Sequence, residues 1–303
     1  MRRPLVFLAA LTGLPLAIAW FLSEQVIHPR RRVEDHDLDD FNLPAEEISF
    51  NSRDGTRLAG WFIPPRDARQ PAPGVVLSHG WARSRCELLP HADFLHRAGY
   101  AVLMFDYRNR GLSEGESITM GVRERGDLLA AVDTLAARPE VDASRIGLLG
   151  MSMGGVLAIL AGAQDARVRS IVAECPFAAH AVIMNRSLRH YFKLPAFPIA
   201  HLARWIIERR LGEPLSGVEP LHSVAGYAPR PLFIIGDERD AVIGLEETER
   251  LFDAAGEPKR WWLIPNADHA RGWQYAREEY EHRVVEFFGE TLAATPTGVG
   301  AAI

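Results

Sequence analysis

The segment Gly150-Met151-Ser152-Met153-Gly154 has the residue types of a nucleophilic turn. In a Gly-x-Ser-x-Gly pattern the glycines allow a tight turn between a strand and a helix, and the turn exposes the serine hydroxyl. The apolar run 145–149 before the motif predicts a strand, and residues 153–164 after it predict a helix. The motif therefore lies where a nucleophilic serine needs it, although a turn with a helix-capping serine has the same composition.

A serine hydroxyl is a weak nucleophile unless a base takes its proton, so the fold must bring a histidine to Ser152. Among the eleven histidines, His269 directly follows the predicted strand 260–264. His79 also follows a strand, but it precedes a glycine and is expected to shape its loop. Because the carboxyl ends of parallel strands share one edge of a sheet, we expect His269 to be the base.

The base in turn needs a carboxylate that orients the imidazole and stabilises its charged form. Asp237, Glu238 and Asp240 all follow the predicted strand 231–236. Asp240 is best placed to reach inward, whereas Asp237 is typical of a turn. Glu174, at the end of the predicted strand 168–173, is an alternative. We expect Asp240 to complete a Ser-His-Asp triad.

Acyl transfer also requires hydrogen-bond donors for the negative oxygen that forms during attack. The backbone N–H of Met153 lies at the start of the predicted helix after Ser152. The loop that leaves the predicted strand 74–78 offers a second N–H, from Trp81. We expect these two groups to form the oxyanion hole.

The elements around these residues predict an α/β fold. A hairpin signal at Asp54-Gly55 joins two short strands, after which strands alternate with helices of ten to sixteen residues. This alternation is typical of a mostly parallel sheet with helices on both faces. The expected strands are 47–51, 57–63, 74–78, 100–105, 145–149, 168–173, 231–236 and 260–264, and the expected helices are 87–98, 122–137, 153–164, 244–255 and 274–290.

Five motifs, in this order, resemble those of the α/β-hydrolase superfamily: Leu77–Trp81, Phe105–Gly115, Gly150–Gly154, Gly236–Asp240 and His269. Within it, the chain is similar to membrane-anchored members near the serine aminopeptidase and monoglyceride-lipase branches. The resemblance spans about residues 46 to 290 and implies an eight-stranded, mostly parallel sheet. The order serine, acid, histidine along the chain agrees with it. Asn109 and Arg110 depart from the simpler pattern of relatives, so the tip of that loop is expected to differ.

Nearly sixty residues separate the strands 168–173 and 231–236, which is too long for a simple connection. We expect a small helical cap at about 177–228. Its aromatic and basic side chains favour a small-molecule acyl substrate, but they are equally compatible with the cap's own core and solvated face. The chain is thus expected to be a carboxylesterase-like serine hydrolase that works through an acyl-enzyme. A serine peptidase, or a non-catalytic binding module on the same scaffold, is the alternative.

The amino terminus predicts a membrane segment. Arg2 and Arg3 precede nineteen uncharged residues, 4–22, which as a helix span roughly 28 Å. The continued apolar run favours a single membrane-anchoring helix. The alternative is a signal peptide cleaved after Ala17-Ile18-Ala19, which would leave an exported soluble protein. Residues 23–45 are expected to form a polar linker, and residues 291–303 a flexible tail.

Composition excludes several other classes of function. A net charge of −5 gives no reason to expect nucleic-acid binding. The two cysteines, Cys86 and Cys175, are too few to predict a disulfide framework. Since no metal-ligand spacing, dinucleotide fingerprint or phosphate-binding loop occurs, we expect neither a cofactor nor a metal.

Overall fold

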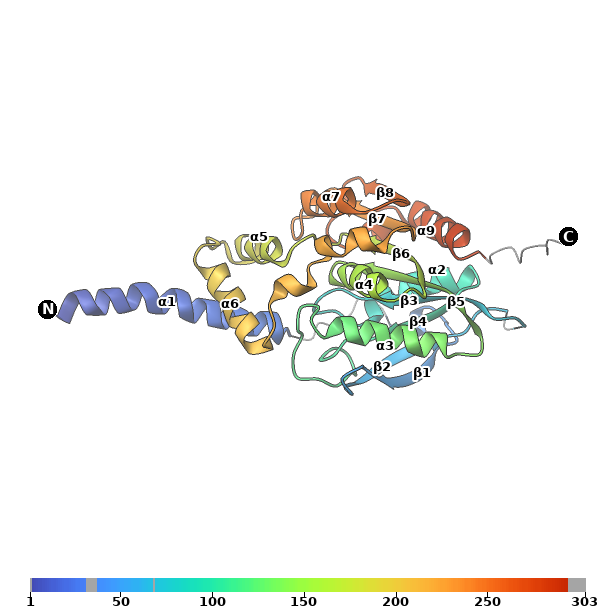
Figure 1. Cartoon of the computed structure of the whole chain (residues 1–303), viewed down its shortest axis with the longest axis horizontal. Coiled ribbons are helices and arrows are strands. Elements are labelled where there is room, and N and C mark those ends of the chain that lie inside the picture. The colour runs from blue at the N-terminus through green and yellow to red at the C-terminus, as the bar shows by residue number, and fades with distance from the viewer. Residues whose placement is uncertain (1, 31–36, 68, 294–303) are drawn as a thin grey trace, which may run out of the picture.

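The protein folds around one eight-stranded sheet with the strand order β1-β2-β4-β3-β5-β6-β7-β8 (Figure 1). The computed structural model describes residues 2–30, 37–67 and 69–293. The strands are β1 (Glu46–Asn51), β2 (Arg57–Ile63), β3 (Ala72–Ser78), β4 (Ala101–Phe105), β5 (Val141–Met151), β6 (Val168–Glu174), β7 (Leu232–Asp237) and β8 (Lys259–Ile264). The predicted eight-stranded α/β architecture is confirmed.

The sheet is mostly parallel. Strand β2 pairs antiparallel with both β1 and β4, and the other five pairings are parallel. In the centre, Leu77 of β3 pairs with Leu149 of β5, and Gly150 pairs with Ala173 of β6. Parallel strands in register end at one edge, so β3, β5, β6, β7 and β8 all deliver their following loops to the same side.

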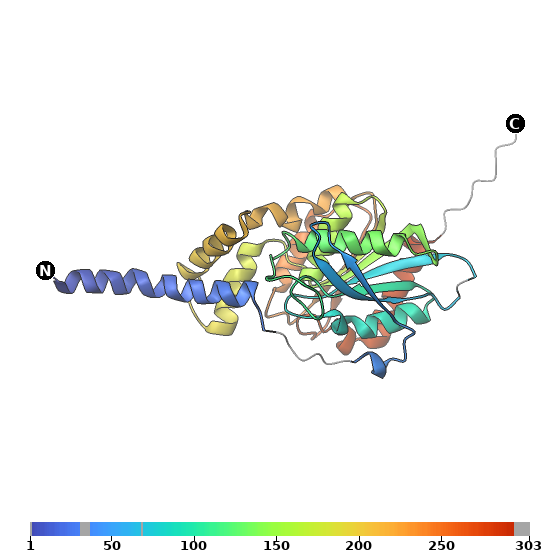
Figure 2. The same ribbon diagram turned by 90° about the horizontal axis from the view of Figure 1, so that it is seen from below.

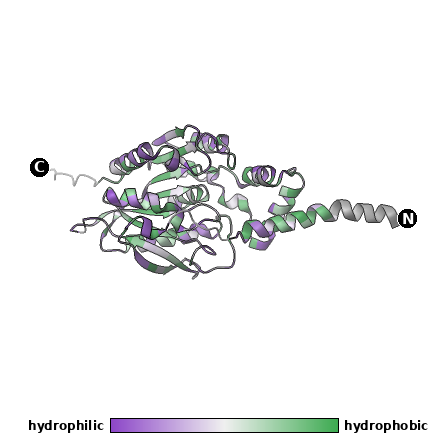
Figure 3. Ribbon diagram, turned by 180° about the vertical axis from the view of Figure 1, so that it is seen from behind, coloured by the Kyte–Doolittle hydropathy of each residue, from purple (hydrophilic) through white to green (hydrophobic). Residues whose placement is uncertain are grey.

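Helices cover both faces of the sheet because successive strand residues point to opposite sides. Leu148 packs in the cluster beneath α3 and α4, whereas Leu149 packs in the cluster beneath α2 and α9. Figure 3 shows hydrophobic strands between helices that mix hydrophobic and hydrophilic residues. The helices of this body are α2 (Leu89–Arg97), α3 (Glu124–Ala136), α4 (Met153–Gln164), α7 (Leu245–Ala254), α8 (Gly272–Tyr275) and α9 (Arg277–Thr291), with short helices η1 (Leu38–Asp40) and η2 (Arg85–Leu88).

The segment between β6 and β7 is helical and lies with the amino-terminal helix at one end of the molecule (Figures 1 and 2). It contains α5 (His180–Phe192), α6 (Ile199–Leu211), η3 (Leu215–Val218), η4 (Pro220–His222) and η5 (Val224–Tyr227). Helix α1 (Arg2–Ile27) packs along α6, where Ala19 and Leu22 are buried with Ala203 and Ile206. Ile27 reaches the main core.

The expected membrane anchor is wrong. Among the described residues, no helix combines the length and the apolar character needed to cross a bilayer. The carboxyl half of α1 includes Ser23, Glu24 and Gln25, and its apolar side chains Ala19, Leu22 and Ile27 are covered by protein. Packing against α6 therefore covers Ala19 and Leu22 of the apolar run, whereas Leu14, Leu16, Trp20 and Phe21 remain exposed. The predicted tail of residues 291–303 falls mostly outside the described residues.

Candidate active site

Ser152 lies in a strained turn between β5 and α4. Its φ of 54° and ψ of −120° place a non-glycine residue in a region that side chains rarely adopt. The glycines around it are required sterically, because a Cβ on Gly154 would lie 1.9 Å from the carbonyl oxygen of Ser78. The Ser152 N–H donates to the carbonyl of Glu174 at 2.8 Å, which fixes the turn to β6. The hydroxyl is thereby held at the carboxyl edge of the sheet.

His269 and Asp240 meet Ser152 in a continuous hydrogen-bonded series. The Ser152 hydroxyl lies 3.0 Å from Nε2 of His269, and Nδ1 of His269 lies 2.7 Å from Oδ2 of Asp240. Oδ1 of Asp240 accepts the backbone N–H groups of Val242 and Ile243, each at 2.8 Å. Asp240 is thus oriented by its own loop while its second oxygen faces the imidazole. The fold brings together side chains separated by 117 positions.

The electrostatics of Asp240 favour its charged form. Burial on its own would raise the pKa of this carboxyl, but the hydrogen bond from His269 and the N–H groups of Ile243 and Val242 hold the pKa below its ordinary value. A carboxylate at this position holds Nδ1 of the imidazole protonated, so Nε2 is free to accept the serine proton.

The loop after β3 carries Trp81, whose N–H is the second oxyanion donor expected from the sequence, and we refer to it as the proposed oxyanion loop. The N–H of Trp81 and the N–H of Met153, the first residue of α4, have no hydrogen-bond partner in the part of the chain that the structure describes. The Ser78 hydroxyl donates to the carbonyl of Gly154 at 3.0 Å and so ties this loop to the start of α4. The indole N–H of Trp81 donates to the carbonyl of Val26 in α1, at 3.1 Å.

His79 shapes this loop from the interior. It is fully buried, its Nδ1–H donates to the carbonyl of Gly80 at 2.8 Å, and its Nε2 accepts the N–H of Tyr107 at 3.1 Å. Burial lowers the pKa of His79 to about 4, so the ring is neutral at physiological pH and can do both. The expectation that His79 is structural and His269 faces the serine agrees with these contacts.

Comparisons with known proteins place this geometry in a family. The chain is 30% identical over 253 residues to the uncharacterized protein YfhR of Escherichia coli K12, covering 82% of each chain. The esterase Pf2001 of Pyrococcus furiosus has a solved structure that superimposes with a TM-score of 0.72 at 28% identity, covering 88% of this chain and 98% of that one. This chain belongs to the α/β-hydrolase superfamily.

Two further matches were found, one to a family model and one to a solved structure of the same fold. Residues 54–199 match the model of the X-Pro dipeptidyl-peptidase S15 family. The fold of this hydrolase also resembles that of an acylaminoacyl peptidase from Pyrococcus horikoshii, with a TM-score of 0.64 at 18% identity, covering 85% of this chain and 43% of that one. Members of the superfamily with esterase and peptidase names are thus both similar to this hydrolase.

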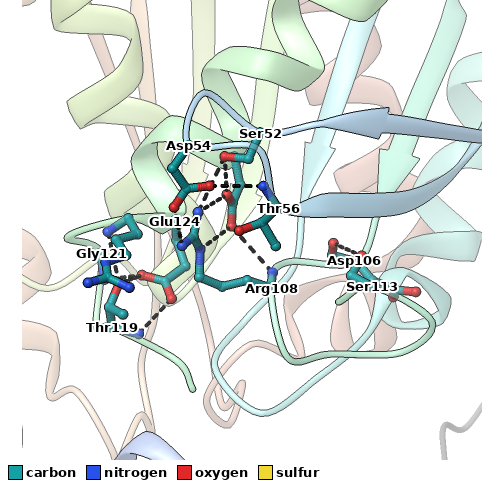
Figure 4. Close-up of polar contacts among 11 residues, drawn as sticks. Ser52, Asp54, Thr56, Asp106, Arg108, Ser113, Thr119, Gly121 and Glu124 are labelled. Atoms are coloured by element: carbon teal, nitrogen blue, oxygen red, sulfur yellow. Dashed lines mark hydrogen bonds and ion pairs between the residues drawn. The ribbon is translucent and has the colours of Figure 1, made fainter. Parts of the chain in front are cut away.

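A buried ion cluster holds the 106–121 loop (Figure 4). The Arg108 guanidinium pairs with Asp127 of α3 at 2.5 Å and with Asp54 of the β1–β2 turn at 2.7 Å. The adjacent Tyr107 hydroxyl lies 2.6 Å from the Ser78 hydroxyl. The loop is therefore tied both to α3 and to the proposed oxyanion loop. The only hint in the sequence was the cluster of Arg and Asn residues at 108–110.

Asp106 folds the tip of the same loop. Its carboxylate accepts the N–H groups of Arg85 at 2.8 Å and Leu112 at 3.0 Å. A Cβ on Gly111 would lie 2.0 Å from Oδ2 of Asp106, and Gly111 has a φ of 44°, so glycine is required there. The Arg110 guanidinium donates to the carbonyl of Pro29, which follows α1. The residue that departs from the family pattern thus fixes the loop to the amino-terminal segment.

The rival acids Glu174 and Asp237 are buried behind the triad and bond elsewhere. The Glu174 carboxylate accepts the hydroxyl of Tyr280 at 2.7 Å and the N–H of Gly272 at 2.9 Å. Asp237 accepts the N–H of Ala270 at 2.8 Å. From the sequence, Glu174 was an alternative triad acid and Asp237 a turn residue. In the hydrolase both are interior acids that contact the loop carrying His269.

One trio of potential metal ligands occurs among the described residues, formed by Cys175, Asp240 and His269, with ligand atoms within 4.8 Å of one another. Asp240 and His269 already bond each other. The pKa of the Cys175 thiol is raised well above its usual value by burial and then by neighbouring acids. A metal needs the thiolate, so the surroundings of Cys175 do not suit one.

Proposed function

We propose that this α/β hydrolase cleaves carboxylic esters of small molecules through an acyl-enzyme, with Ser152 as nucleophile, His269 as base and Asp240 as the orienting acid. The observation that carries the proposal is the hydrogen-bonded series from Ser152 through His269 to Asp240, with links of 3.0 and 2.7 Å. These lengths suit proton transfer from the hydroxyl to Nε2 without rearrangement of the loops. The order and roles of the three side chains are those of a serine hydrolase.

The proposed reaction begins when the Ser152 oxygen attacks the ester carbonyl and its proton passes to Nε2 of His269. The N–H groups of Met153 and Trp81 donate to the oxyanion that forms, an interaction worth about 3 kcal/mol per donor. The carbon–oxygen bond of the leaving group breaks as His269 returns the proton to the departing alcohol. Water then attacks the acyl group, with His269 again as base, and releases the acid and the free Ser152 hydroxyl.

We also propose that residues 177–228 act as a cap that selects the substrate. They follow β6 and precede β7, the strands that end in Glu174 and Asp237 behind the triad. Phe177 and His180 of this segment are buried, and the Nε2–H of His180 donates to the Met120 carbonyl at 2.8 Å. A short helical cap of this size favours compact acyl groups over long chains.

The test is active-site labelling of the full-length protein. Wild type is expected to react with a fluorophosphonate probe and to hydrolyse p-nitrophenyl acetate and butyrate. Ser152→Ala is expected to abolish labelling and lower kcat by about 10⁶-fold, while Ser144→Ala, an exposed serine near the other end of β5, leaves both unchanged. Persistent labelling of Ser152→Ala overturns the assignment. Well-folded wild type that labels with no probe favours a non-catalytic binding module.

A peptidase is the second candidate, because residues 54–199 match the X-Pro dipeptidyl-peptidase family. The same triad attacks amides, but the leaving amine must be protonated by His269 as it departs. Comparing kcat/KM for a p-nitrophenyl ester with that for an X-Pro p-nitroanilide separates the two. Preference for the anilide would replace the esterase assignment and leave the triad in place.

A further inference from the structure

Three buried acids gather at the ends of neighbouring strands, but only one of them faces the imidazole. Glu174 ends β6, Asp237 ends β7, and Asp240 follows three residues later; all are at most 6% exposed. Asp240 bonds His269. Burying two more carboxyls so close to a working carboxylate is electrostatically costly, so their retention requires a compensating interaction.

The other two acids hold the backbone that carries His269. Asp237 accepts the N–H of Ala270 at 2.8 Å, and Glu174 accepts the N–H of Gly272 at 2.9 Å. Ala270 has a φ of 55°, a conformation that costs energy in a residue with a Cβ. Two carboxyls therefore bond the first and third residues after His269 and stabilise a strained segment.

Both carboxyls converge on one glycine. A Cβ on Gly272 would lie 2.9 Å from Oε1 of Glu174 and 3.2 Å from Oδ1 of Asp237. Oδ1 of Asp237 is buried and has no hydrogen-bond partner among the described residues. Because a buried carboxylate oxygen without a partner is costly, this position favours the protonated form of Asp237.

The charges that act on Asp237 come from several elements. Glu174 and Cys175 approach from the end of β6, Asp240 and His269 from the loops of the triad, and Tyr280 from α9. Burial, followed by the charges of Glu174 and Asp240, raises the pKa of Asp237 to about 9. Burial is also the largest cause that raises the pKa of Glu174. Two interacting acids of this kind titrate as a pair.

We propose that Glu174 and Asp237 are positioning residues that retain one proton between them and fix the main chain of the His269 loop, so that Asp240 is the fully charged acid against the imidazole. This inference rests on the proposed function of the triad. When the shared proton passes to hydroxide at high pH, two negative charges meet behind Gly272, and their repulsion displaces the segment from Ala270 to Gly272 that both carboxyls hold. The imidazole then moves away from the Ser152 hydroxyl. A shift of this kind lowers kcat with little effect on KM.

The pH dependence of kcat tests the proposal in the full-length protein, with p-nitrophenyl butyrate as substrate and rates followed from pH 6 to 10.5. Wild type is expected to lose kcat with an apparent pKa of about 9. Asp237→Asn and Glu174→Gln cannot build up the second charge, so in each the alkaline loss is expected to move upward by at least about one pH unit. The matched control Asp253→Asn, on the exposed side of α7, is expected to keep the wild-type profile.

Asp237→Ala separates positioning from charge. It removes the acceptor for the Ala270 N–H, and kcat at pH 7 is expected to fall at least about tenfold below that of Asp237→Asn, with KM changed less than about threefold. An alkaline loss at the same pH in wild type, Asp237→Asn and Glu174→Gln would overturn the inference. Equal kcat in the Ala and Asn variants would overturn it as well. If wild type fails to react with a fluorophosphonate, the proposed function fails first; labelled wild type with unchanged variant profiles rejects the proton-sharing pair alone.

Discussion

At the scale of single residues, the two oxygens of Asp240 have different hydrogen-bond partners. Oδ1 accepts two backbone N–H groups, and Oδ2 faces Nδ1 of His269. Glu174 and Asp237 lie nearby, but Glu174 bonds Tyr280 and Gly272, and Asp237 bonds Ala270 through Oδ2. Among the described residues neither of them hydrogen-bonds to His269, so the proposed acid role depends on Asp240.

Replacing the carboxylate of Asp240 by an amide tests whether the proposed reaction depends on this side chain. In Asp240→Asn the Oδ1 contacts can persist, but the amide presents the wrong partner to the imidazole and cannot stabilise its charge. We expect kcat for p-nitrophenyl butyrate to fall by about 10⁴-fold at pH 7.5. Asp268→Asn removes the same charge from the residue before His269 and should change kcat by less than about threefold. A loss below about tenfold in Asp240→Asn would show that another acid serves His269.

At the scale of secondary-structure elements, α1 packs into the body of the α/β-hydrolase fold. Its last turn gives the Val26 carbonyl to the indole of Trp81 and the Ile27 carbonyl to the N–H of Ile118. Glu24 pairs with Arg210 of α6. The helix therefore joins the segment between β6 and β7 to the two loops beside the triad, a role that its apolar composition conceals.

Trp81→Phe removes the indole donor to α1 while keeping an aromatic ring. A partly buried hydrogen bond of this kind contributes about 1 kcal/mol, so we expect the free energy of unfolding to fall by that amount. The variant keeps the backbone N–H of residue 81, but without the indole contact this proposed oxyanion donor should be displaced. We therefore expect kcat to fall by about tenfold with KM nearly constant. Trp205→Phe, on the exposed face of α6, is the matched control and should alter neither quantity. An unchanged kcat in Trp81→Phe would show that α1 does not position the proposed oxyanion loop.

At the scale of the whole molecule, the strands and the order of the chemical motifs were predictable, because a buried parallel strand has a continuous apolar run and each motif lies just after one. The hairpin at Asp54-Gly55 was equally visible, since turn type depends on local sequence. Long-range burial was not predictable. The contact of Ala19 and Leu22 with α6, and the pairing of Arg108 with Asp127, arise only when distant elements pack. The sequence of an apolar helix does not show whether protein or lipid covers the helix.

The buried titratable groups together set how stability varies with pH. Burial lowers the pKa of His79 and of His180 to about 4, so the unfolded chain binds these protons more readily and stability is lost as pH falls from about 6.5 to 4. Asp237, with a pKa of about 9, affects stability in the opposite direction, because the folded state binds its proton more readily than the unfolded chain does. Its contribution to stability declines by up to about 1.4 kcal/mol per pH unit as pH rises from about 4 to 9. Above pH 6.5 the histidine effect has ended and the decline from Asp237 continues, with the same sign as that from Glu174 and Glu124, whose pKa values are also raised by burial.

We therefore expect the melting temperature of wild type to be highest near pH 6 and to fall steadily towards pH 9. In Asp237→Asn the titrating group is gone, so the fall from pH 6.5 to 9 should be distinctly shallower, whereas Asp253→Asn should follow wild type. Differential scanning calorimetry at half-unit steps measures this directly. A melting temperature that rises between pH 7 and 9, or that falls equally in wild type and Asp237→Asn, would mean that Asp237 is already ionised in the native protein, and the acid layer behind the triad would then carry two charges at neutral pH.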